Sequence, residues 1–384
     1  MRAVFFGTYD RPHSANRLLR AACTEAGFAV SELHEPLWEE TREKGARYFS
    51  PGSLVALGRR YLAIAGRLAA RWRADVASGE PPIVFVGFGG QLDVLLAARV
   101  CRPRRALVFA PLVSLTETLV EDRAVFRAGS PRARALTALD RATWRRSDLV
   151  LIDTAAHADY LVELGARRDR VAPWHLGAEP EFWSAPTLPV EPRRVLFVGR
   201  CVPLHGLATI VEAAARLGDR ASLVVIGRGP ERAAAEARAR DLGVAIEWRD
   251  EVPLAALPAE LARSAVVLGV FGAGRKAAMV VPNKVYQAAA AGRPLVTRDG
   301  PALREVLTPG EHCVTCPPND PDALAAAIAG LLADPPAAQR MGAAARARLA
   351  RDFSPARLAQ ALGATLEATL GIHATVPSQA RAGG

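Results

Sequence analysis

Short runs of β-branched and apolar residues alternate with helix-period segments along most of this 384-residue chain. This alternation is typical of a parallel sheet with helices on both faces. A first set of strands is expected at 3–6, 29–33, 83–86, 106–109, 149–153 and 171–174. A second set is expected at 195–198, 223–226, 245–248, 266–270, 294–297 and 313–316. The chain is therefore predicted to build a doubly wound α/β sheet twice.

A proline-rich stretch without periodicity, GAEPEFWSAPTLPVEPRR, separates the two sets. It is interpreted as an interdomain linker near residues 178–193, because Pro and the lack of a period mark loops. The predicted domains are 1–185 and 190–354, both Rossmann-like. Helices are expected at 336–351 and 355–371, and the helix at 355–372 is assigned to the first domain. Residues 373–384 form a tail.

Composition narrows the functional classes. The net charge is +10, but the basic residues are spread along the chain and aromatics are only 6%, so no nucleic-acid partner is expected. No apolar run is long enough to span a membrane. The N-terminus enters a strand pattern without a signal peptide, and five Cys in a large chain favour a cytoplasmic protein. The pair Cys313 and Cys316 is interpreted as buried strand residues in preference to a redox or metal site.

Residues 53–74 combine arginines with Leu, Ile, Tyr and Trp. The arginines are Arg59, Arg60, Arg67, Arg71 and Arg73. One interpretation is a helix packed on its own sheet with the arginines outward. The other is a basic amphipathic helix that makes a peripheral contact with the anionic inner face of a membrane. The sequence leaves both open.

Glycine turns follow several of the expected strands. Gly7 and Gly199 come after the first strand of each set, and Gly227 and Gly229 follow a later strand. Ligands of doubly wound sheets bind outside the carboxyl ends of strands, where glycine permits close approach, although a tight turn alone would also explain each glycine. No full G-x-G-x-x-G precedes a helix, which argues against a dinucleotide oxidoreductase.

The second domain carries the stronger constellation. Arg200 lies just past a strand and His205 just before a helix. Asn283 and Lys284 fall at the start of another helix, where backbone N–H groups and the macrodipole favour an anion. The alternatives are a surface salt bridge for Arg200 and a solvated first-turn charge for Lys284. Lys is rare here: the chain has only three, Lys44, Lys276 and Lys284.

The order of these features resembles glycosyltransferase family 4. It runs Gly-Arg, Gly, helix, G-x-G-P, and then helix-AAG-x-P-strand-x-D-x-x-x-x-x-E over most of residues 190–355. The resemblance implies a GT-B fold: two Rossmann-like domains facing across a cleft, with the last helix crossing back to the N-domain. It also implies a retaining, metal-independent enzyme that moves a sugar from a nucleotide-diphosphate donor to an acceptor hydroxyl, without a cofactor. The acceptor is a glycan, a lipid-linked molecule or a small molecule.

Matching the family residue by residue assigns roles. Arg200 and Lys284 are the expected catalytic residues. The expected donor-binding residues are Gly7, Gly199, His205, Gly227, Gly229, Glu251, Val252, Asn283 and Gln287. The chain departs from the family at His205, where Lys is usual, and at Met279 and Gln287, where Glu is usual. Lys284 is predicted to replace the lost cation, and His205 is expected to act protonated. These departures also keep open a catalytically weak GT-B scaffold subunit or a nucleotide-sugar epimerase.

Acceptor contacts are expected in the first domain. The candidates are His13, Ser114, Glu117, Asp122 and Arg123, with a solvated helix face as the alternative for the last four. Asp320-Pro321-Asp322 is interpreted as a helix cap in preference to a metal site. Lys284→Ala is predicted to lower kcat/KM about ten- to a hundredfold with little change in stability, and Lys276→Ala to do much less.

Overall fold

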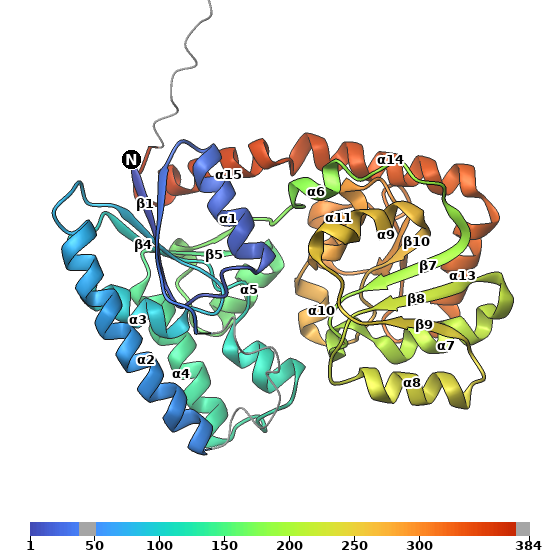
Figure 1. Ribbon diagram of the computed structural model, residues 1–384, viewed down its shortest axis with the longest axis horizontal. Helices are drawn as coiled ribbons and strands as arrows, with labels where there is room; N and C mark the ends of the chain where they lie inside the picture. The colour runs from blue at the N-terminus through green and yellow to red at the C-terminus, as the bar shows by residue number, and fades with distance from the viewer. Residues whose placement is uncertain (38–50, 374–384) are drawn as a thin grey trace, which may run out of the picture. The chain divides into compact units, whose positions relative to one another are not determined.

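The structure is a computed structural model that describes residues 1–37 and 51–373 (Figure 1). Its contacts divide the chain into two compact units. The first unit contains Met1–Thr116, Val125–Leu176 and Pro355–Gly384, and the second contains Glu117–Ala124 and Gly177–Ser354. Each unit is built around one sheet with helices on both faces (Figure 1).

The sheet of the first unit has six parallel strands in the order β2-β1-β3-β4-β5-β6. They are β1 (Arg2–Gly7), β2 (Ala29–His34), β3 (Ile83–Val86), β4 (Ala106–Phe109), β5 (Leu149–Ile152) and β6 (Val171–Pro173). Every residue of β3, β4 and β5 is buried, as expected for strands covered on both faces.

The helices of the first unit cover this sheet. They are α1 (Ser14–Glu25), α2 (Pro51–Arg71), α3 (Gln91–Val100), α4 (Pro131–Arg146), α5 (Ala155–Glu163) and α15 (Pro355–Leu370). Because parallel crossovers are right-handed, α2, α3 and α4 lie on one face of the sheet and α1 on the other. The last helix, α15, packs beside α1 (Figure 1). The Trp174 indole N–H donates to the Leu358 carbonyl oxygen at 3.0 Å, which fixes α15 to this unit.

The sheet of the second unit also has six parallel strands, in the order β12-β11-β10-β7-β8-β9. They are β7 (Glu191–Val198), β8 (Ser222–Ile226), β9 (Ile246–Arg249), β10 (Ser264–Leu268), β11 (Leu295–Arg298) and β12 (Val314–Cys316). The helices are α6 (Pro180–Trp183), α7 (Leu207–Leu217), α8 (Arg232–Asp241), α9 (Leu257–Arg263), α10 (Arg275–Met279), α11 (Asn283–Ala290), α12 (Pro301–Val306), α13 (Pro321–Ala333) and α14 (Pro335–Asp352).

All of the predicted strands are present, so the doubly wound fold predicted for each half is confirmed. The expected linker differs. The segment expected to be the linker belongs to the second unit from Gly177 onward, and strand β7 begins within that segment at Glu191. The physical reason is burial: Phe182 of α6 is fully enclosed, and the Arg346 guanidinium donates to the Trp183 carbonyl oxygen at 2.6 Å.

A second difference is a short excursion of the chain. Glu117–Ala124 follows β4 of the first unit in sequence, yet it packs with the second unit. Most of it is a single π-helical turn, Glu117–Asp122, which contacts α10. The chain then returns to the first unit at Val125.

Candidate functional site

Two glycine loops meet at the carboxyl ends of β7 and β8 in the second unit. Gly199 has φ 153° and Gly227 has φ 138°, both in the region that favours glycine. A Cβ on Gly227 would collide with the Gly199 carbonyl oxygen. The close packing of these two loops therefore requires glycine, and the Gly199 loop lies directly beside Lys284.

Lys284 is the second residue of α11, and its side chain runs under the Gly199 loop. It is 8% exposed, and its Nζ lies 3.9 Å from the centre of the Phe197 ring. Among the described residues, Nζ has no hydrogen-bond partner. Burial lowers the pKa of Lys284 well below its ordinary value. The expectation of a solvated first-turn charge is therefore wrong, because every residue of α11 from Lys284 to Ala290 is buried.

His205 lies beside Lys284 at the end of a 3₁₀ turn, Pro203–His205. Its Nδ1–H donates to the Arg200 carbonyl oxygen, and its ring meets Phe197 edge-on at 5.3 Å. Burial first, and the Lys284 charge second, hold the pKa of His205 well below its ordinary value. The expectation that His205 acts protonated concerns a His205 with a diphosphate beside it, so it stays a prediction; in the free protein burial opposes protonation.

Arg200 begins the same loop, and its side chain is exposed. Within the part of the chain that the structure describes, it forms no ion pair, so a surface salt bridge does not explain it. Arg123 lies near enough that the Arg200 charge lowers its pKa, after burial as the larger cause. Two guanidinium groups therefore converge beside the loop that holds His205.

Lys276, another of the three lysines of the chain, lies in a buried ion pair. Its Nζ lies 3.3 Å from the Glu117 carboxylate and 3.0 Å from the Thr118 hydroxyl, and both Lys276 and Glu117 are buried. Asp122 accepts the backbone N–H of Leu204, and burial raises the pKa of its carboxyl group. Glu117, Asp122 and Arg123 were expected in the first domain; this is wrong, because all three pack within the second unit.

The substituted family positions are buried too. Met279 is 4% exposed. The Gln287 amide donates from Nε2 to the Glu179 carboxylate at 3.0 Å, and both side chains are buried. Glu179 was not singled out from the sequence, because it lies in the segment interpreted as a linker. The amide of Gln287, which was expected to bind the donor, is therefore held by a neighbouring carboxylate.

Comparison with known proteins agrees with this architecture. Residues 192–334 match the family described as glycosyl transferases group 1. A solved structure, Anabaena Alr3699/HepE in complex with UDP, superposes with a TM-score of 0.67 at 15% identity, covering 96% of this chain and 100% of that chain. The fold of the chain is therefore GT-B, and its second unit matches the glycosyl transferases group 1 family. The predicted resemblance and GT-B fold are thus confirmed.

Curated relatives match over shorter lengths. A glycogen synthase of Mycobacterium tuberculosis is 51% identical over 67 residues, which is 17% of this chain and 16% of that protein. A phosphatidyl-myo-inositol mannosyltransferase of Mycolicibacterium smegmatis is 35% identical over 160 residues, which is 40% of each chain. The chain therefore spans less than half the length of these two relatives.

In the first unit of this GT-B protein, the remaining predicted residues are scattered. Gly7 ends β1, and the next residue, Thr8, donates its backbone N–H to the buried Asp93 carboxylate at 2.7 Å. His13 caps α1, where its Nδ1 accepts the Ala15 N–H at 3.2 Å. Ser114 is 1% exposed, so it is not on a solvated helix face.

Several other expectations concern structural roles. Cys313 and Cys316 are free and buried, and burial raises their pKa to about 12. Cys316 ends β12, and Cys313 comes directly before it. Asp320 caps α13 by accepting the Ala323 N–H at 2.9 Å, as predicted. Glu251 is exposed and Val252 half-buried after β9. Among the described residues, no helix is long and apolar enough to cross a membrane.

Proposed function

We propose that this protein transfers a sugar from a nucleotide-diphosphate sugar to an acceptor hydroxyl. The single observation that carries the proposal is Lys284. Its ammonium group is buried at the start of α11 without a hydrogen-bond partner among the described residues, beside the Gly199 loop. A buried cation without a partner is costly, and a diphosphate at this loop would supply the missing anion.

The chemistry requires stabilisation of negative charge on the leaving phosphate. Lys284 and the first-turn N–H groups of α11 would supply fixed positive charge there without reorganisation. Arg200 would add a second cation from the opposite end of the loop, whereas the one N–H of a neutral His205 is already donated to the Arg200 carbonyl oxygen and is not free for the phosphate. We assign the catalytic roles to Arg200 and Lys284, in keeping with the family resemblance.

The stereochemistry and metal dependence are part of the same proposal. The family resemblance supports retention of configuration and metal independence. The donor phosphate would take up the proton of the acceptor hydroxyl as the bond to the sugar breaks. UDP is the first donor nucleotide to test, because the Anabaena structure contains it.

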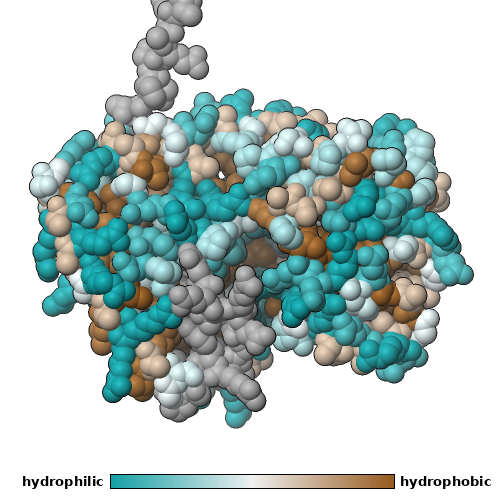
Figure 2. Space-filling view, in the orientation of Figure 1, coloured by the Kyte–Doolittle hydropathy of each residue, from teal (hydrophilic) through white to brown (hydrophobic). Residues whose placement is uncertain are grey.

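The acceptor side includes a peripheral membrane contact through residues 53–74. The outward face of α2 carries Val55 and Leu62, which are 57% and 71% exposed, together with the exposed Arg59. Figure 2 shows hydrophobic side chains among hydrophilic ones along the edge where Figure 1 draws α2. Exposed apolar residues flanked by arginine favour an anionic bilayer. A lipid-linked acceptor fits this contact.

Thermal-shift measurements with UDP, GDP, ADP, CDP and dTDP test the donor assignment, because a ligand that binds only the folded state raises the midpoint. Hydrolysis of the matching nucleotide-sugar without acceptor then separates an enzyme from an inactive scaffold. Product analysis separates a transferase from an epimerase. If no nucleotide shifts the midpoint at millimolar concentration, the donor assignment is wrong.

A further inference from the structure

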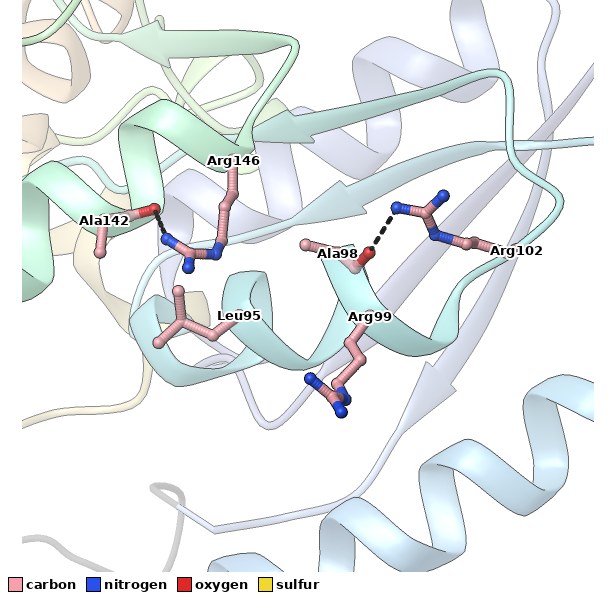
Figure 3. A pocket seen from close by; sticks show the side chains of 6 residues that line it. All are labelled: Leu95, Ala98, Arg99, Arg102, Ala142 and Arg146. Atoms are coloured by element: carbon pink, nitrogen blue, oxygen red, sulfur yellow. Dashed lines mark hydrogen bonds between the residues drawn. The ribbon is translucent and has the colours of Figure 1, made fainter.

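A groove of about 630 Å³ lies between α3 and α4 in the first unit (Figure 3). Its lining residues are Leu95, Ala98, Arg99, Arg102, Ala142 and Arg146. None of them is acidic, and none has a role in the proposed sugar transfer. The groove lies on the same face of the sheet as α2, because the crossovers that carry α2, α3 and α4 share one hand.

The charge of this groove is not neutralised. The Arg102 guanidinium, just past the end of α3, donates only to the Ala98 carbonyl oxygen at 3.5 Å, and the Arg146 guanidinium only to the Ala142 carbonyl oxygen of α4 at 3.0 Å (Figure 3). Arg99 has no ion pair among the described residues, and neither do the other two. By contrast, Arg67 of α2 pairs with Glu35 at 2.9 Å. Three exposed guanidinium groups around one hollow form a ready site for an anion with several oxygens.

Exposed apolar side chains occur on α2 and α3, two helices of the same face of the sheet. Leu92 is 37% exposed and lies on the groove side of α3, since Leu92, Leu95 and Arg99 follow the spacing of one helix face. Val55 and Leu62 are the exposed apolar side chains of α2. Four large hydrophobic side chains are exposed in the described part of the chain, and Leu92, Val55 and Leu62 are the three with the highest exposure. A soluble anion needs no such exposed apolar side chains, whereas a bilayer does.

We propose that this groove binds the phosphate-bearing headgroup of an anionic membrane lipid while Leu92 and the outward face of α2 rest on the bilayer. This proposal rests on the peripheral membrane contact proposed above and adds the headgroup site. It assigns lipid-charge recognition to α3 and α4, outside the 53–74 segment.

Vesicle co-sedimentation of the full chain tests the proposal. The vesicles are pure phosphatidylcholine or phosphatidylcholine with about one third phosphatidylglycerol, and each arginine near an anionic surface contributes about a fivefold gain in partition. The variant Arg99→Gln/Arg102→Gln/Arg146→Gln should lose about a hundredfold in partition onto the anionic vesicles. The matched control, Arg240→Gln/Arg340→Gln/Arg357→Gln, removes the same charge from exposed positions of α8, α14 and α15 and should bind like wild type.

The outcomes separate the two proposals. Leu62→Gln should weaken binding to both kinds of vesicle, since it removes apolar contact and no charge. If wild type binds neither vesicle, the membrane contact and the headgroup site are both overturned. Equal partition of the groove variant and its control overturns the headgroup site alone. So does a groove variant that loses affinity for inorganic phosphate while keeping its full partition onto anionic vesicles. Donor hydrolysis, measured without lipid, reports on sugar transfer independently.

Discussion

Replacing Lys284 with Met should make the unliganded protein more stable. The ammonium group is buried under the Gly199 loop without a hydrogen-bond partner among the described residues. If the side chain keeps its proton, desolvation costs several kcal/mol and the contact with the Phe197 ring returns about 2 kcal/mol. If it releases the proton, as its lowered pKa favours, the cost is the free energy of that pKa shift instead. Met keeps the unbranched apolar stem and removes the charge. A net gain of about 1–3 kcal/mol is expected for Lys284→Met.

The assay is thermal unfolding of wild type and Lys284→Met, each with and without millimolar UDP. For a unit of this size, 1–3 kcal/mol corresponds to a rise of about 2–12 °C in the midpoint. UDP should raise the midpoint of wild type and shift the variant much less, because the variant lacks the cation that the diphosphate would meet.

Two results would refute this reasoning. A lower midpoint for unliganded Lys284→Met would show that the fold itself stabilises the ammonium group. A full UDP shift in the variant would show that Lys284 does not contact the nucleotide. The expectation that a change at Lys284 leaves stability nearly unaltered came from treating it as a surface residue, and its burial overturns that expectation.

Three further predictions follow from the described contacts. Diphosphate binding should be accompanied by proton uptake, because burial lowers the pKa of Lys284 in the free protein and a bound anion raises it. The affinity for the diphosphate should then fall as the pH rises from the pKa of Lys284 in the free protein toward its pKa in the complex. Calorimetry in buffers of different ionisation enthalpy measures the proton uptake, and Lys284→Met should show none. Lys276→Met should destabilise the protein by about 3–5 kcal/mol, because it removes the cation beside the buried Glu117 carboxylate. The double variant Glu117→Gln/Lys276→Met should recover most of this loss in urea unfolding, and a double variant as unstable as the single one would contradict the pairing. Burial raises the pKa of Asp93 to about 6, above its unfolded value near 4, so its contribution to stability is present below pH ~4 and is lost as pH rises through 6. Asp93→Asn should remove about 1–3 kcal/mol of this pH dependence. If the urea midpoint of the variant follows the wild-type profile from pH 4 to 7, Asp93 is not the group responsible.

The strands could be predicted from sequence because their signal is local. A run such as IVFV in β3 is apolar throughout, and only a strand covered on both faces tolerates this in so short a segment. The glycine loops of the second unit were found for the same reason. The turns of Gly227 and Gly229 need glycine because the loop after the neighbouring strand β7 packs against them, whereas the Gly199 turn also meets Lys284 of the distant α11.

The environment of the charged residues could not be predicted in this way. A first-turn Lys is usually solvated, and only the uncharged run that follows Lys284 in α11 signals that the whole helix is enclosed. Nothing local indicates that Glu117 pairs with Lys276, since 159 positions separate them (276 minus 117) and the contact depends on the chain leaving one unit for the other. Long-range pairing of this kind is fixed by packing and not by pattern.

The excursion Glu117–Ala124 has a consequence for how this protein can be recombined. The second unit is not a contiguous piece of the chain, so a gene fragment that starts at Gly177 lacks the carboxylate that neutralises Lys276. A chimera joined at that point would pair the acidic segment of one parent with the lysine of another. Exchange of the complete second unit between such proteins therefore needs two grafts, the long one after Leu176 and the eight residues from Glu117 to Ala124. During synthesis, this short segment emerges before the unit that it completes.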